Sequence, residues 1–315
     1  MNPVYCLIVL INILSAAFLT AAEIYDFIPR HSQQVLQINL DVLQGMESFR
    51  DDMVRNVFRH SGIENKKYNV SGFNNLVEKM VIVTPVLTED STFVLIKARM
   101  PEMEFCRRLE EMTGIRQKVV GTPSSRVRTV TFSGSEIFPG LSTQKRTFSF
   151  AFLTPEIAVF AKNDLNAWMR CGDRGLPDQV RKKLAVPKAL TAGFLKTTPE
   201  FLMDNPLLPQ ILSASYFLSP GPANSLIIKA AASCADEKSA DLTQKQFQQY
   251  IMVGGIFLNQ VDPELMQDWI TSVRIDRDKN RIFLNAFFTR QFLTRLESAL
   301  DKLFENRKSM IENKG

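Results

Sequence analysis

The sequence predicts an α+β fold of two similar halves, each an antiparallel sheet covered by helices. Short β-rich runs alternate with amphipathic segments of helical spacing, and turn residues separate them. The apolar content of 45% over 315 residues is enough for a sizeable core. The apolar runs that end at Ala98, Ala230 and Ala286 are each followed by a helical segment, so one strand–helix unit recurs along the chain.

The chain begins with an apolar segment. Residues 1–22 carry no charged side chain and end in small residues, which is typical of a secretory signal peptide cleaved before Glu23. The stretch from Val4 to Ala22 is also nearly as long as the roughly 20 residues that a membrane-spanning helix needs. We therefore expect a secreted or periplasmic protein, with a membrane anchor at Val4 to Ala22 as the alternative.

The first half is predicted to span residues 23–170. An amphipathic helix is expected from Leu43 to His60, and the runs "EKMVIVTPVL" and "STFVLIKARM" are expected to form a hairpin. Pro101 is well placed to open the next helix, and four short strands with a helix from Asp164 to Arg170 complete this half. The half begins with a strand, "QVLQINLD", which alternates Val35, Gln37 and Asn39 with Leu36, Ile38 and Leu40.

The second half is predicted to span residues 171–315, after a segment rich in glycine, proline and charge. Its strands are "ALTAGFLKT", "QILSASYFLS" and "NSLIIKAAASC", and "SVRIDRDKNRIFLNAFF" is expected to form a hairpin before a closing helix. A helix is expected from about Ser239 to Leu258, with Gly254 and Gly255 loosening its end, and a short one from Pro263 to Trp269. The apolar residues assigned to the longer helix are Leu242, Phe247, Ile251 and Phe257.

The recurring unit predicts which side chains are buried. Phe105 and Leu109 after the first strand match Phe292 and Leu296 after the last, so the two helices are expected to lay these residues on their sheets. Arg108 and Arg295 are then expected on the outer faces. The recurrence is interpreted as a packing unit rather than as a functional site.

The order of these pieces resembles a broad group of uncharacterised secreted proteins of planctomycete and lentisphaeran bacteria. The resemblance lies in the opening "IPRHSQQVLQINLDVL", in the strand "FVLIKAR", and in "ILSASYFLS" paired with "SLIIKAAASCADEKSA". It implies a bacterial envelope location and a repeated α+β fold. It implies no activity, cofactor or functional residue.

The residues that could carry catalysis are few. His31 and His60 are the chain's two histidines, and the sequence has no Walker A, G-x-S-x-G or G-x-G-x-x-G motif. The pairs Glu110–Glu111 and Asp262/Glu264 could in principle act as acid and base in a glycosidase, but solvated helix surfaces explain them as well. "DRDKNR", which begins at Asp276, resembles a calcium loop but has arginine and phenylalanine where glycine and glutamate are required. We expect no catalytic, cofactor or metal site.

Charge and cysteines set further limits. The net charge of +5 is spread along the chain, and its densest basic stretch, between Arg107 and Arg128, is interpreted as solvated surface rather than as a nucleic-acid site. Cys106, Cys171 and Cys234 remain after cleavage, which permits at most one internal disulfide. "NVS" at Asn69 is a glycosylation acceptor only in a eukaryotic host.

The sequence therefore predicts a non-enzymatic secreted or periplasmic envelope protein, a structural or interaction scaffold. One alternative is a carrier that holds an apolar ligand in a cleft between sheet and helices, suggested by the 23 phenylalanines. The other is an unrecognised hydrolase. Another envelope protein is the partner that we consider. We expect no nucleic acid as a partner, and a membrane only if the segment before Glu23 stays uncleaved.

N-terminal sequencing of the protein from its native host tests the predicted signal. We expect the mature chain to begin at or within a few residues of Glu23, because the small residues before it suit a signal peptidase. Recovery of intact Met1 from the membrane fraction would replace secretion with anchoring.

Overall fold

A computed structural model describes residues 23–44, 75–86, 92–113, 118–120, 127–133, 145–162, 165–198 and 211–299. The predicted signal peptide, most of the helix predicted from Leu43 to His60, and Asn69 lie outside these residues. No helix in the described ranges is long and apolar enough to cross a membrane.

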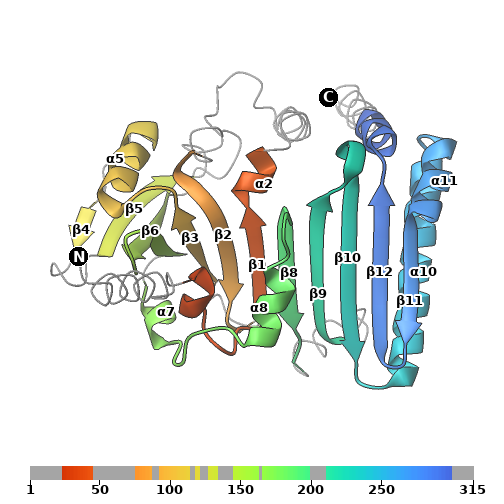
Figure 1. Cartoon of the computed structure of the whole chain (residues 1–315), viewed down its shortest axis with the longest axis horizontal. Coiled ribbons are helices and arrows are strands. Elements are labelled where there is room, and N and C mark those ends of the chain that lie inside the picture. The colour runs from red at the N-terminus through yellow and green to blue at the C-terminus, as the bar shows by residue number, and fades with distance from the viewer. Residues whose placement is uncertain are drawn as a thin grey trace, which may run out of the picture.

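The described strands form one continuous antiparallel sheet of twelve, in the order β11-β12-β10-β9-β8-β1-β2-β3-β7-β6-β5-β4 (Figure 1). The predicted α+β class is thus confirmed, and the two predicted segments share one sheet. The strands are β1 (Gln34–Asn39), β2 (Val77–Thr84), β3 (Phe93–Ala98), β4 (Lys118–Val120), β5 (Val127–Ser133), β6 (Lys145–Phe152), β7 (Ile157–Lys162), β8 (Thr191–Lys196), β9 (Ile211–Pro220), β10 (Leu226–Cys234), β11 (Val273–Asp278) and β12 (Arg281–Phe288).

Helices lie on both faces of the sheet. The predicted helix after Pro101 is α5, and α10 runs straight through the glycine pair that was expected to loosen its end. The α-helices are α2 (Leu40–Gln44), α5 (Glu102–Thr113), α7 (Asn166–Arg170), α8 (Asp178–Leu184), α10 (Glu237–Asn259) and α11 (Pro263–Ser272). Residues 290–299 form a further helix, and η1 (Ile24–Phe27) and η2 (Pro222–Asn224) are 3₁₀ turns.

One face is covered by η1, α7 and α8. Tyr25, Trp168 and Leu184 from these elements pack with Val35 of β1 and Leu95 of β3 in a buried cluster. The alternating residues of the same strands face the other way and pack against α2 and α5. Strands buried on both faces explain the near-continuous apolar run "FVLI" in β3.

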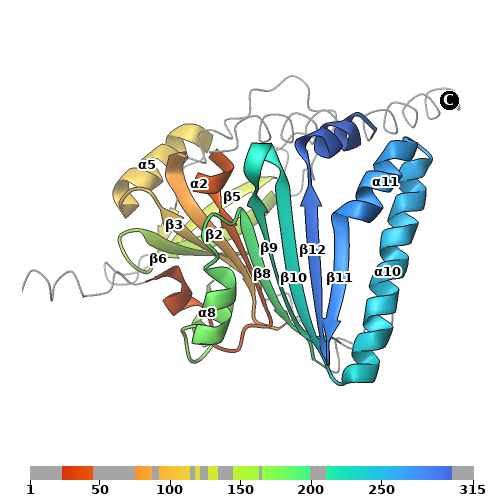
Figure 2. The same cartoon turned by 45° about the vertical axis from the view of Figure 1, so that its right-hand side comes forward.

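The second face continues under α10 and α11. Phe217 of β9 joins the cluster on the α8 face, and its neighbour Leu218 packs in the cluster with Leu258 of α10 and Leu265 of α11. Because successive strand residues point to opposite faces, α10 and α11 lie on the same face as α5. Figures 1 and 2 show α10 at the outer edge of this face, beside β11 at one end of the sheet.

The recurring strand–helix unit is placed differently from the expectation. Counted outward from the β1–β8 pair, the strands run β1, β2, β3, β7, β6, β5, β4 on one side and β8, β9, β10, β12, β11 on the other. The strand that ends at Ala98 is third on its side, whereas the strand through Ala286 is fourth, so the two are not in equivalent places. The strand through Ala230, which continues to Cys234, is third. Similarity of the two halves stays a prediction.

The side chains assigned to those units are buried as expected. Phe105 is 1% exposed and packs edge-on against Phe152, at 5.6 Å between ring centroids. Phe292 is 2% exposed and stacks on Phe288 at 4.9 Å. Leu109 and Leu296 are half-buried at the borders of the same clusters.

Candidate interaction surface

Helix α10 begins at a strong cap and ends at a tight turn into α11. The Asp236 carboxylate accepts a hydrogen bond from the Ser239 backbone N–H at 2.7 Å, which satisfies one of the open donors of the first turn. At the other end, Asp262 accepts a bond from the Glu264 N–H at 3.0 Å, and Pro263 opens α11. The two helices thus form one rigid hairpin.

The inner side of α10 is shaped by its glycine pair. A Cβ at Gly254 would lie 3.3 Å from the Trp269 ring, and one at Gly255 would lie 3.3 Å from Ile270. The missing side chains therefore let α11 approach closely. The Trp269 indole N–H donates to the Ile251 carbonyl at 2.9 Å, and its ring stacks on Phe288 at 5.6 Å. This contact fixes which side of α10 faces inward.

The outer side of α10 carries large apolar side chains in the open. Between Gln246 and Gln260 the chain has no charged residue. A monomer rarely exposes a contiguous apolar strip without using it for contact. We call this set the α10 stripe: Leu242 (54% exposed), Tyr250 (53%), Val253 (63%), Ile256 (52%) and Phe257 (52%).

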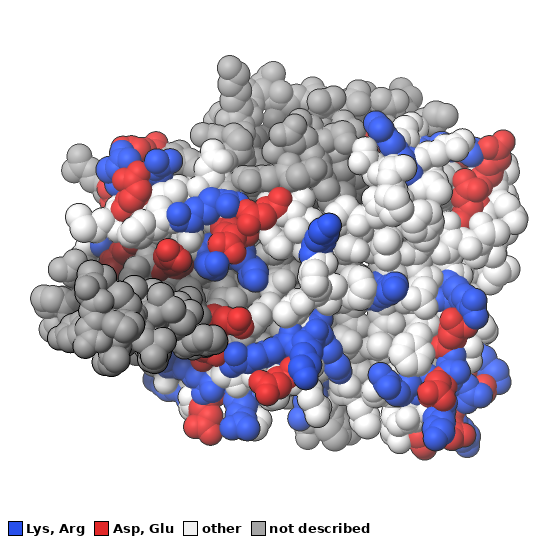
Figure 3. All heavy atoms as spheres, viewed as in Figure 1, with Lys and Arg blue, Asp and Glu red and all other residues white. Residues whose placement is uncertain are grey.

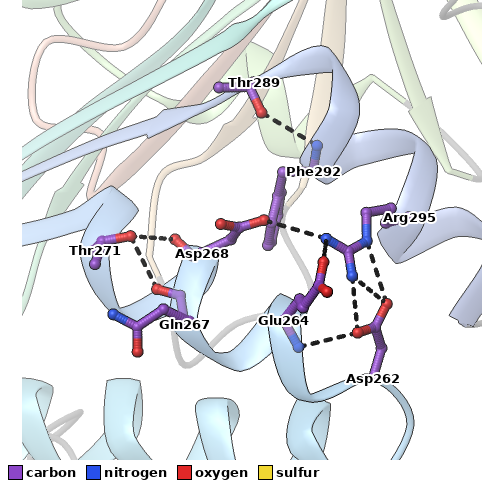
Figure 4. Close-up of polar contacts among 8 residues, drawn as sticks. All are labelled: Asp262, Glu264, Gln267, Asp268, Thr271, Thr289, Phe292 and Arg295. Atoms are coloured by element: carbon purple, nitrogen blue, oxygen red, sulfur yellow. Dashed lines mark hydrogen bonds and ion pairs between the residues drawn. The ribbon is translucent and has the colours of Figure 1, made fainter.

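Arg295 ties the helix at 290–299 to the start of α11 (Figure 4). Its guanidinium donates to both carboxylate oxygens of Asp262 at 2.9 Å and contacts Glu264 at 2.6 Å and Asp268 at 3.9 Å. Burial alone would raise the pKa of Asp262, but the hydrogen bonds from Arg295 and the Glu264 N–H outweigh it and hold this pKa below 3.8. Arg295 was expected on an outer face, yet its side chain is 25% exposed and fully engaged.

A cavity of about 360 Å³ lies beside this cluster. Apolar Val261, Pro263 and Ala299 line it together with polar Asp262 and Arg295. The lining is therefore mixed, and its two charged groups already neutralise each other.

The remaining carboxylates considered for catalysis also have partners or lie in the open. Of the pair Glu110–Glu111, Glu111 forms an ion pair with Arg107. Neighbouring Glu104, which was not among the candidates, accepts hydrogen bonds from Arg107 and Arg108 that lower its pKa to about 2. In the supposed calcium loop, Asp276 pairs with Arg274 at 2.9 Å. There the Asn280 amide donates to the Cys234 carbonyl at 3.1 Å, and His31 is exposed.

Charges of both signs are mixed on the surface. Arg128 pairs with Glu102 at 2.9 Å, so at least three arginines of the densest basic stretch face carboxylates. Figure 3 shows lysines and arginines beside aspartates and glutamates over α5 and along the lower edge of the molecule. Arg107 and Arg108 are about half exposed, as expected of solvated surface, whereas the Arg128 side chain is 14% exposed and departs from that interpretation.

Comparison with known proteins adds a likeness of fold. No protein-family model matches the chain, and no curated protein matches it. The chain is similar to the crystal structure of TP0453 in form III, with 9% identity and a TM-score of 0.52, covering 90% of this chain and 99% of that one. Form I of TP0453 gives a TM-score of 0.46 at 8% identity. At this identity the form III match shows a shared fold and carries no function.

Arg295→Ala tests the cluster through its pH dependence. At neutral pH we expect the variant to melt roughly 2–4 °C below the parent, because three carboxylates lose their shared cation. Asp262 has a depressed folded-state pKa. The stability that ionised Asp262 contributes to the fold is therefore complete above its unfolded-state pKa of about 3.9. It is lost as the pH falls through the pKa of Asp262 in the folded state. The difference between variant and parent should therefore shrink below about pH 4.

Arg274→Ala is the matched control, because Arg274 also pairs with an aspartate but is 78% exposed. It should melt like the parent at every pH. An Arg295→Ala variant that behaves like this control would show that the cluster does not hold the helix at 290–299.

Proposed function

We propose that this chain is a non-enzymatic envelope protein, secreted or periplasmic, that serves as an interaction scaffold through the α10 stripe. The observation that carries the proposal is the exposure of that stripe. Five large apolar side chains, each about half exposed, follow one face of a helix whose opposite face is packed on α11 and the sheet. Covering such a surface with a partner removes it from water at about 25 cal/mol per Å².

The chemistry of the carboxylates supports a non-enzymatic role. A general acid of a glycosidase needs a pKa raised toward neutrality, whereas the pKa of Asp262 is lowered. Asp262 and Glu264 are bound by Arg295 and hold two helices together. Asp262 and Glu264 therefore act as structural groups.

The carrier alternative has less support. The cavity of about 360 Å³ has charged Asp262 and Arg295 in its lining, which suits an apolar ligand poorly. Phe93, Phe105, Phe150 and Phe292 are buried in the packed clusters and do not line this cavity.

The envelope location is supported by the uncharged apolar segment before Glu23. In an extracytoplasmic setting, another envelope protein is the natural class of partner for an exposed apolar helix.

Native electrophoresis of gently solubilised envelope extracts tests this role. We expect the chain to migrate as a complex larger than its monomer. The triple variant Val253→Gln, Ile256→Gln and Phe257→Gln should migrate as the monomer, with an unchanged thermal melt because these side chains are exposed. If parent and variant migrate alike, the stripe is not an interaction surface.

A further inference from the structure

We infer that the partner of the α10 stripe is a second copy of this chain, packed helix against helix in antiparallel sense about a two-fold axis near Val253. This inference rests on the proposed interaction role and names the partner. The spacing of side chains along α10, the absence of charge and the position of the stripe support a second copy as the partner.

The spacing along α10 is that of a helix–helix seam. Leu242, Gln246, Gln249, Val253, Ile256 and Gln260 recur at intervals of four and three residues, the a and d pattern that places one row of side chains against a second helix. Tyr250 and Phe257 flank this row and would widen the buried area. With the axis near Val253, residues 247–259 of the two copies overlap, which at 1.5 Å per residue gives a helix–helix contact about 20 Å long.

The charge pattern suits a copy of the same helix. In a two-fold contact each surface meets itself, so a charged seam would place like charges together. From Gln246 to Gln260 the seam has no charge, and glutamine both donates and accepts hydrogen bonds, so it complements itself. Lys238 and Lys245 lie at the N-terminal end of the helix, and an antiparallel arrangement keeps them away from their counterparts.

A bilayer fits the same surface less well. Gln246, Gln249 and Gln260 lie in the seam, and burying an amide in hydrocarbon without a partner is costly. Lys245 would be the cation nearest the apolar residues, but it is paired with Asp241 at 2.7 Å. A helix that binds a lipid surface instead carries cations along its polar face.

The position of α10 allows a second copy to approach. The helix lies at the outer edge of the molecule, away from α5 and α8 (Figure 2). The edge strand β11 beside it carries Arg274, Asp276, Arg277 and Asp278, and charges on an edge strand disfavour strand-to-strand pairing. Contact between two copies is thereby directed to the helix.

Sedimentation velocity over a range of concentrations tests the inference with the purified full chain. We expect a monomer–dimer equilibrium in the parent. Val253→Glu should weaken it at least tenfold, because the two introduced carboxylates meet at the axis. Gln248→Glu adds the same charge on an exposed site about 140° around the helix and should leave it unchanged.

A cysteine pair tests the antiparallel sense. Oxidised Val253→Cys should form a disulfide-linked dimer, because residues near a two-fold axis face their own copies. Leu242→Cys, far from the axis, should not cross-link in an antiparallel pair, whereas a parallel pair would cross-link at both positions. Native Cys106 and Cys234 are buried, but Cys171 is half-buried, so the cross-linking is measured in a Cys171→Ser background.

A parent that stays monomeric at hundreds of micromolar overturns the second copy. If envelope extracts still contain the stripe-dependent complex, the scaffold role stands with a different partner. If the monomer instead binds phosphatidylcholine vesicles and Val253→Glu does not, the occupant of the stripe is a lipid surface.

Discussion

The pairing of β1 with β8 is the constraint on which the rest of the structure depends. Five residue pairs, from Gln34↔Leu195 to Ile38↔Thr191, join the two sides of the described sheet. A buried amide beside this pair ties β1 to η1 and α8: Tyr25 donates to Gln37, and Gln37 donates to the Leu184 carbonyl of α8 at 3.3 Å. Burial raises the pKa of Tyr25 to about 12, so its hydroxyl stays a donor. An unpartnered buried amide would cost about 1–3 kcal/mol, which penalises any other register.

From this pair outward, the order of elements on the β8 side brings α10 to the surface. On the β8 side, hairpin β9–β10 leads into α10, and β12 then returns beside β10 while β11 forms the edge. Because α10 covers the outermost strands, its inner face is used by α11 and its outer face has nowhere further to pack within the described sheet. The exposed stripe is thus a consequence of where the helix lies. The absence of charged residues from Gln246 to Gln260 and the glutamines beside the stripe are what suit it to a copy of itself.

Much of the fold follows from local sequence pattern, while the functional surface does not. The hairpins and α5 were predictable, because alternation, turn residues and Pro101 act over short range. Gln37 was taken for the polar face of a half-buried strand, yet it is 3% exposed, because helices cover the sheet on both faces. Helix α8 was missed in a glycine- and proline-rich segment, although the spacing of Val180 and Leu184 marks its buried side. Val253 points outward because glycines occupy the inner side of α10. The hydrophobicity of the residues alone does not predict which side of the helix faces inward.

Equilibrium unfolding in urea, with single-tryptophan variants, tests most directly whether both sides of the sheet form one unit. The chain's two tryptophans lie in different clusters: Trp168 in the cluster built mainly on β1, β2, β3 and β7, which Ala192 of β8 joins, and Trp269 in the cluster with β12. In Trp269→Phe and in Trp168→Phe, the transition seen by the remaining tryptophan should coincide with that seen by far-ultraviolet circular dichroism, as for one cooperative unit. A tryptophan transition separated from the dichroism transition, or a biphasic dichroism curve, would contradict a single sheet held together at β1 and β8.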